Sequence, residues 1–192
     1  VHEDSFLRGG WDKQRYRLMN RNGFATCGAD YGQYLLEDIL ENPPASVKLF
    51  YLTIANSLAP DIRVKLDALK AARPDAVFVE NVRPEDITAE VIAARAEKAG
   101  IHRFTAPGAA NVCSAEGIVL VQALKDGPLE IDFGSSGAVH DAMTGVFVCN
   151  GPNVVLPFHT GETRLFKKGK SQAISGKSVH LPCRRAYCLM LK

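Results

Sequence analysis

The sequence lacks the features that identify membrane proteins, secreted disulfide-rich proteins and dedicated nucleic-acid binders. No apolar run approaches the roughly 18 residues of a transmembrane helix, so we expect no membrane association. The first ten residues contain no apolar core of a signal peptide. Cysteines number five, an odd count at scattered positions, which is typical of free thiols and predicts a cytoplasmic protein. The net charge of +2 does not favour nucleic acid as a partner.

The motifs of several enzyme classes are also missing. There is no GxSxG nucleophile elbow, no GxxxxGK[ST] phosphate-binding loop, and no GxGxxG dinucleotide fingerprint after the first expected strand. Cys183 and Cys188 lie close together near His180, but the spacing supplies no fourth zinc ligand. We therefore expect no metal and no cofactor. No catalytic motif identifies the chain as an enzyme.

What the sequence does contain is a central apolar stretch, residues 47–56 (VKLFYLTIAN), in which seven of ten residues are apolar. Such a run is typical of a strand that helices cover on both faces. Around it we expect helices at residues 31–41, 59–72 and 84–99 and strands at residues 24–27, 76–79 and 101–105. This alternation predicts an α/β domain over residues 24–106, with a flavodoxin-like open parallel sheet. Residues 1–23 are expected to form an N-terminal helix.

The pattern changes near residue 107. Helical periodicity disappears, and short apolar runs alternate with turn-forming dipeptides such as EG, DG, TG and NG. Turns at this spacing predict a small antiparallel all-β domain over residues 107–168. Residues 169–192 form a basic tail without a clear period, although residues 186–191 could add a strand or a short helix. For the tail, disorder and a functional basic surface both stay open.

Candidate site residues follow from the predicted sheet, because ligands bind beyond the carboxyl ends of parallel strands. These ends supply Cys27, Asp30, Asn56, Ser57, Glu80 and Asn81. In a catalytic interpretation Glu80 is a base and Cys27 a nucleophile, and the other four bind a ligand.

A structural interpretation of the same residues is the simpler one. Asp30 and Ser57 would then cap helices, because short polar side chains accept hydrogen bonds from helix N-termini. Asn56 and Asn81 would hold turns. Cys27 would be a small buried apolar residue.

The chain also resembles a known family. The strings VKLFYLTIAN, IHRFTAPGAANVCSAEGIVLVQAL and GETRLFKKG, and the order of the parts, resemble the C-terminal region of family 42 β-galactosidase-like glycoside hydrolases. In that family a TIM barrel carries catalysis, a flavodoxin-like domain supports trimerisation, and a small β domain ends the chain. The resemblance covers residues 24–168. The family's catalytic glutamates lie in the barrel, so it implies no catalytic residue here.

The resemblance implies a non-catalytic accessory or oligomerisation module, or a truncated product of a glycoside-hydrolase-like protein without its barrel. Its partners would be further copies of the chain or the missing catalytic domain, contacted through Trp11, Tyr16 and Tyr34. Carbohydrate is another candidate partner, if aromatic rings of the β domain form an exposed row. The candidates for that row are Phe133, Phe147, Phe158 and Phe166, although the core of the β domain is the simpler place for these rings. The alternative is a small independent hydrolase or ligand-binding protein that uses the pocket at the strand ends.

Overall fold

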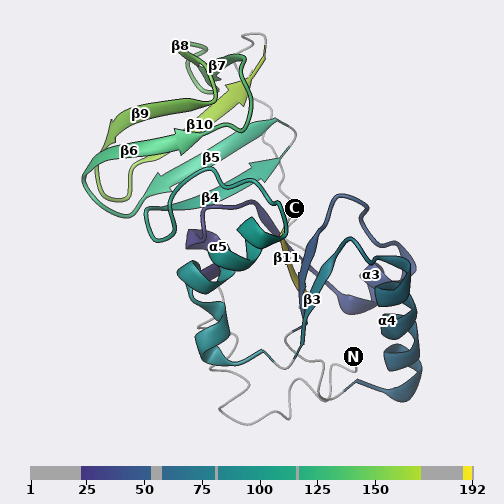
Figure 1. Cartoon of the computed structure of the whole chain (residues 1–192). Helices are drawn as coiled ribbons and strands as arrows, with labels where there is room; N and C mark the ends of the chain where they lie inside the picture. The colour runs from purple at the N-terminus through teal and green to yellow at the C-terminus, as the bar shows by residue number, and fades with distance from the viewer. Residues whose placement is uncertain (1–22, 53–57, 81, 116, 170–187, 192) are drawn as a thin grey trace.

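The computed structural model describes residues 23–52, 58–80, 82–115, 117–169 and 188–191 (Figure 1). Its first part builds a sheet with helices around it. The elements there are β1 (Tyr31–Tyr34), α3 (Leu36–Glu41), β2 (Leu49–Tyr51), α4 (Pro60–Ala72), β3 (Val77–Val79), the 3-10 helix η2 (Pro84–Ile87) and α5 (Ala89–Lys98). A strand from the other end of the chain, β11 (Cys188–Leu191), joins this sheet.

The predicted flavodoxin-like open parallel sheet is wrong. The four strands lie in the order β1-β11-β2-β3, and β11 runs antiparallel to both of its neighbours. Within the described chain, β2 and β3 are the only parallel pair of this sheet. An apolar run predicts that a strand is buried, but it does not predict which strand lies beside it. Here a strand from the predicted tail takes the place between β1 and β2.

Two local predictions fail for related reasons. The segment expected to be helical over residues 31–41 begins as strand β1, which pairs with β11, and only then continues as α3. The expected strand at residues 24–27 is mostly helical, and residues 101–105 contribute a single bridge, between Arg103 and Ala29. Long-range pairing thus outweighs the local apolar period.

The double burial of the central stretch is confirmed for β2. Phe50 packs on one face, where its ring stacks on Phe78 at 4.6 Å between centroids and 5° between planes. Tyr51 points to the other face, where its ring meets Phe24 edge-on at 4.9 Å. Helices α3 and α4 cover the Phe50 face, and α5 covers the Tyr51 face. Adjacent strand residues point to opposite faces, so β2 joins two apolar clusters.

Helix α4 begins and ends close to its predicted bounds, whereas α5 begins at Ala89 because residues 84–87 form the 3-10 helix η2. Pro60 occupies the first turn of α4, where its missing N–H costs nothing, and the Thr88 hydroxyl accepts a hydrogen bond from the Val91 N–H at 3.3 Å at the start of α5. Arg73 ends α4, and its guanidinium donates to the carbonyl oxygen of Val47 at 2.7 Å. This contact ties the end of α4 to the loop that leads into β2.

The second part is built from antiparallel strands, in agreement with the turn spacing. The strands are β4 (Ala110–Ala115), β5 (Ile118–Ala123), β6 (Gly127–Asp132), β7 (Ala138–Asp141), β8 (Phe147–Asn150), β9 (Asn153–Phe158) and β10 (Thr163–Lys168). Five of them form a sheet in the order β4-β5-β10-β7-β8, and β6 pairs with β9. Figure 1 shows β7 and β8 at the end of this part that lies away from the helices.

Three of the four phenylalanines proposed for a carbohydrate-binding row are core residues. Phe133 and Phe166 lie edge to face at 5.5 Å between centroids, and Phe158 is buried in the same cluster. Phe147 is the exception and stands largely in solvent. These rings therefore form an apolar core and not an exposed row.

Backbone and side-chain hydrogen bonds join the two parts. The Asp30 carboxylate accepts from the backbone N–H of Ser114 in β4 at 2.9 Å, and the Gly108 N–H donates to the Thr26 carbonyl oxygen at 2.8 Å. The boundary at residue 106 stays a prediction, and the expected helix at residues 1–23 lies almost wholly outside the described residues. None of the described helices has the length and apolar character needed to cross a membrane.

Candidate functional site

The carboxyl ends of β2 and β3 lie side by side at the same end of the sheet, because these two strands are parallel. We call this place the strand-end edge. Glu80 follows β3 directly and lies at this edge. Asn56, Ser57 and Asn81 lie outside the described residues. Of the predicted set, Glu80 is therefore the residue that the described chain places at the expected edge.

Glu80 is held by two cations from α4. Its Oε2 accepts from the Arg63 guanidinium at 2.5 Å, and its Oε1 accepts from the Lys70 ammonium group. Arg63 and Lys70 are seven residues apart, so they lie two turns apart on one face of the helix. Partial burial raises the pKa of Glu80, but the hydrogen bonds from Lys70 and Arg63 outweigh this and leave the pKa below its usual value. An ionised carboxylate with both oxygens occupied is a poor proton acceptor.

Cys27 has the environment of a structural thiol. The side chain is fully buried, and its Sγ donates to the Phe24 carbonyl oxygen at 3.1 Å. Burial raises the pKa of the Cys27 thiol, which disfavours the thiolate that a nucleophile requires. A backbone hydrogen bond at Ala29 and the charge of Arg103 lower the pKa of the thiol, but burial outweighs both.

Asp30 lies away from the edge where Glu80 lies, in the segment before β1. It is nearly buried, and its hydrogen bond to the Ser114 N–H holds β4 against this segment. The expected helix-capping role does not apply, because the next element is the strand β1. Cys27, Asp30 and Glu80 therefore each have a packing or pairing role in the described chain.

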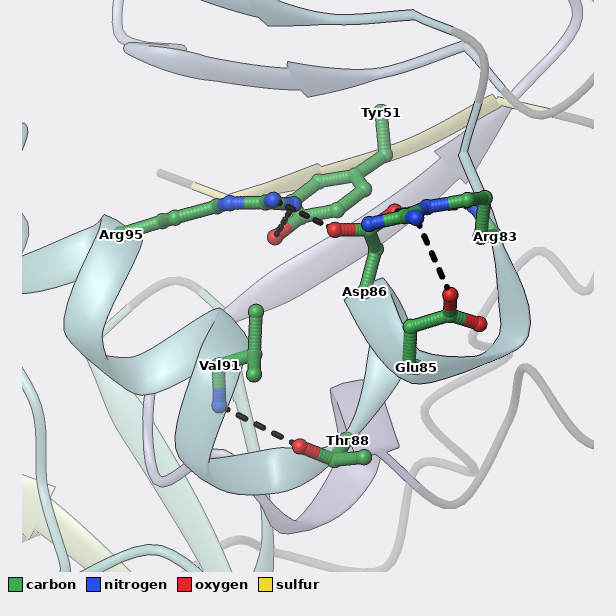
Figure 2. Close-up of polar contacts among 7 residues, drawn as sticks. All are labelled: Tyr51, Arg83, Glu85, Asp86, Thr88, Val91 and Arg95. Carbon is green, nitrogen blue, oxygen red and sulfur yellow. Dashed lines mark hydrogen bonds and ion pairs between the residues drawn. The ribbon is translucent and has the colours of Figure 1, made fainter.

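A second polar network lies on the opposite face of the sheet, and the sequence did not reveal it (Figure 2). The Arg95 guanidinium of α5 donates to the Tyr51 hydroxyl at 3.2 Å and to Asp86 Oδ1 of η2 at 2.7 Å. The same guanidinium lies 5.6 Å from the centroid of the Tyr51 ring. Asp86 Oδ2 accepts from the backbone N–H of Arg83 at 3.0 Å. The network thus joins β2, η2 and α5.

The electrostatics of this network favour a structural role. Burial raises the pKa of the Tyr51 hydroxyl, so the phenol stays protonated at neutral pH. The Arg83 N–H and then the Arg95 guanidinium lower the pKa of Asp86, which is therefore ionised. The two carboxylate oxygens of Asp86 accept from different residues, and the Tyr51 side chain is fully buried. These contacts hold η2 and the last turn of α5 against the sheet.

Sequence reasoning missed both sets of partners for different reasons. Arg63 and Lys70 could have been found, because the helix between two parallel strands packs back on the sheet and its basic face must lie near the strand end. Asp86 and Arg95 are separated by the junction between η2 and α5, and no helical spacing applies across it. In the described ranges, no group of three or more His, Cys, Asp or Glu residues is arranged to hold a metal ion.

Three exposed apolar side chains gather at the turn between β7 and β8. Met143, Val146 and Phe147 are 66%, 63% and 56% exposed. We call them the β8 apolar surface. The Phe147 ring is held edge-on against His140 of β7 at 5.7 Å between centroids. The residues predicted to contact a partner do not form such a surface in the described chain. Tyr34 is partly buried and packs against the apolar cluster under helices α3 and α4. Trp11 and Tyr16 lie outside the described residues.

Comparison with known proteins adds one weak likeness. No family model matches the chain, and no curated protein matches it. A solved structure that it resembles is a β-galactosidase from Bacillus circulans sp. alkalophilus, with a TM-score of 0.32 and 16% identity. The match covers 48% of this chain and 14% of that chain, so it spans a small part of the enzyme's length. At this TM-score the likeness carries no inference about fold or activity.

Proposed function

We propose that this chain is a non-catalytic module that associates with further copies of itself. The observation that carries the proposal is the β8 apolar surface, where Met143, Val146 and Phe147 are exposed within one five-residue stretch of the chain. Exposed apolar side chains scattered singly are ordinary, but a cluster of large ones marks a contact surface.

The candidate catalytic groups support the same proposal, because each of them already has a structural role. Glu80 is paired with Arg63 and Lys70, and Cys27 is fully buried. An independent hydrolase would need one of these groups to reach a substrate. Both are engaged in holding elements together, which gives the hydrolase alternative weaker support.

The sequence resemblance gives this module a context. Residues 24–168 resemble the region that follows the catalytic barrel in family 42 glycoside hydrolases. The module would therefore belong to a protein of carbohydrate metabolism and would hold copies together without touching the substrate. A separate catalytic domain is the other partner that this context supplies.

The energetics set the strength of the expected association. Fully burying one side chain of this kind stabilises by about 1.5–3 kcal/mol. Association costs at least about 4 kcal/mol in lost translational and rotational freedom. Three side chains alone support weak association, so the neighbouring backbone must contribute to a stable complex.

Light scattering coupled to size exclusion tests the proposal over a range of protein concentrations, with and without galactosides. We expect a dimer or higher oligomer whose mass rises with concentration and does not respond to sugar. A monomer at every concentration would overturn self-association. Hydrolysis of a galactoside that Glu80→Gln abolishes, while far-UV circular dichroism shows that the variant is folded, would instead support the hydrolase alternative.

A further inference from the structure

An Asn-Gly pair, Asn150 and Gly151, lies where β8 ends and the connection to β9 begins. The two strands belong to different sheets, so the hydrogen bonds of a β-hairpin do not close this connection. Asn150 is exposed, and within the described chain its side-chain amide makes no hydrogen bond. The amide group can therefore turn toward the main chain.

Gly151 leaves the backbone nitrogen beside this amide unhindered. Glycine has no Cβ, and a Cβ added to Gly151 would meet no atom within 4 Å. The pairing of β7 with β8 ends at Asn150, whose Cα partner is Ala138. The end of an edge strand opens locally at little cost, and such an opening brings the amide and the nitrogen together.

We propose that Asn150 is a site of spontaneous modification, at which the side-chain amide becomes a carboxylate. The backbone nitrogen of Gly151 attacks Cγ of Asn150, so a bond forms between these two atoms and the bond from Cγ to Nδ2 breaks. Ammonia leaves with the proton of the Gly151 N–H, and a cyclic imide remains. Water is the co-reactant that reopens the ring, and no electron is transferred. This site goes beyond the proposed function and does not depend on self-association.

The carbonyl carbon that water attacks decides the product. Attack at Cγ restores the original main chain and leaves an aspartate. Attack at the backbone carbonyl carbon leaves an isoaspartate, in which the main chain runs through Cγ and gains a methylene group. Either product places a negative charge within residues 142–161, which contain no Asp, Glu, Lys or Arg.

The isoaspartate form also lengthens the main chain between two points of attachment. Asn150 pairs with Ala138 on one side, and on the other the Pro152 carbonyl oxygen accepts from the Phe133 N–H at 2.5 Å. A methylene group added between these attachments must shift one of them. We therefore expect the Phe133 amide of this form to lose protection from hydrogen exchange.

Two other asparagines of the β domain give comparisons within the same chain. Asn153 is also exposed, but the β-branched Val154 follows it and hinders the approach to the backbone nitrogen. Asn111 also precedes a valine, and its amide donates to Gln122 Oε1 at 2.9 Å. Asn150 differs from both because its amide is exposed and a glycine follows it.

Incubation of the full chain in mildly alkaline buffer tests the proposal, because base removes the proton of the attacking nitrogen. Peptide mapping by mass spectrometry measures the conversion at each asparagine, since a carboxylate is heavier than an amide. We expect Asn150 to convert at least roughly tenfold faster than Asn153, which corresponds to about 1.4 kcal/mol in the barrier. Gly151→Ala is the matched variant, because the added Cβ fits without contact, and it should slow conversion at Asn150 to a similar degree.

A denatured sample separates the chemistry from the fold, and far-UV circular dichroism checks that the Gly151→Ala variant is folded. Conversion of Asn150 in denaturant alone would show that the fold protects this residue and would overturn the proposal. Equal rates at Asn150 and Asn153 in the folded chain, or a rate that Gly151→Ala leaves unchanged, would also overturn it. A chain that light scattering shows to be monomeric overturns self-association and leaves this site in place, because the reaction occurs within one chain.

Discussion

The two faces of the four-stranded sheet use different means to hold their helices. On the α4 face, Phe50 stacks on Phe78, and Glu80 pairs with two cations that solvent reaches. On the α5 face, a fully buried tyrosine takes part in both the apolar cluster and the polar network. The first face separates apolar packing from charge. The second combines them in one side chain, so a small change there disturbs both.

The largest expected effect comes from the apolar part of the α4 face. Phe50→Ala removes a fully buried ring and leaves a cavity, and we expect the free energy of unfolding to fall by about 3–5 kcal/mol. Phe78→Ala removes the stacked partner, which is only partly buried, and should cost less. Denaturant unfolding followed by circular dichroism measures both. Equal losses would show that the stacking contact, and not burial, dominates.

A smaller effect is expected on the α5 face from loss of a single hydroxyl. Tyr51→Phe keeps the ring against Phe24 and removes the acceptor of the Arg95 hydrogen bond. Net loss of such a bond costs about 0.5–1.5 kcal/mol. Denaturant unfolding should therefore show a modest loss of stability with an unchanged slope. No loss would mean that Arg95 keeps its role through Asp86 alone.

The smallest expected effect is the loss of stability in acid that comes from the carboxylates of Glu80 and Asp86. The pKa values of Glu80 and Asp86 are lowered in the folded chain, so the folded state binds fewer protons than the unfolded state in the acid range. The stabilisation is complete above the unfolded pKa values of about 4.3 and 3.9, and it is lost as the pH falls below them and through the lower pKa values of the folded chain. Thermal melts between neutral and acid pH should therefore show a falling melting temperature.

Substitution assigns this acid sensitivity to one face or the other. Glu80→Gln and Asp86→Asn should each lower the melting temperature at neutral pH and make its decline in acid shallower. A decline identical to wild type in both variants would place the acid-sensitive groups elsewhere.

The sequence predicted which segments are buried or form turns better than it predicted which strands pair with one another. The apolar run at β2 and the turns after residue 107 follow from local composition, and both appear in the structure. The pairing of β1 with β11 does not, because no local signal connects residues 31–34 with residues 188–191. The apolar residues of this first segment fit a helix equally well, and the distant strand decided between the two forms.

The position of Glu80 was predictable, and its chemistry was not. Glu80 follows β3, as the apolar run before it indicates, but its function as a base or as an ion-pair partner depends on which face of α4 meets the strand end. The link between Tyr51 and Arg95 joins residues 44 positions apart. Such contacts follow from the packing of α5 on the sheet, which composition and spacing do not encode.

The position of β11 has a consequence for how the protein is made. This strand separates β1 from β2, yet the ribosome synthesises it long after both of them. The early segments therefore leave the ribosome with their edges unpaired, and the sheet is completed only when the last described strand arrives. Contacts this distant along the chain slow folding. The nascent chain thus passes through a period in which exposed strand edges can pair with the wrong partner.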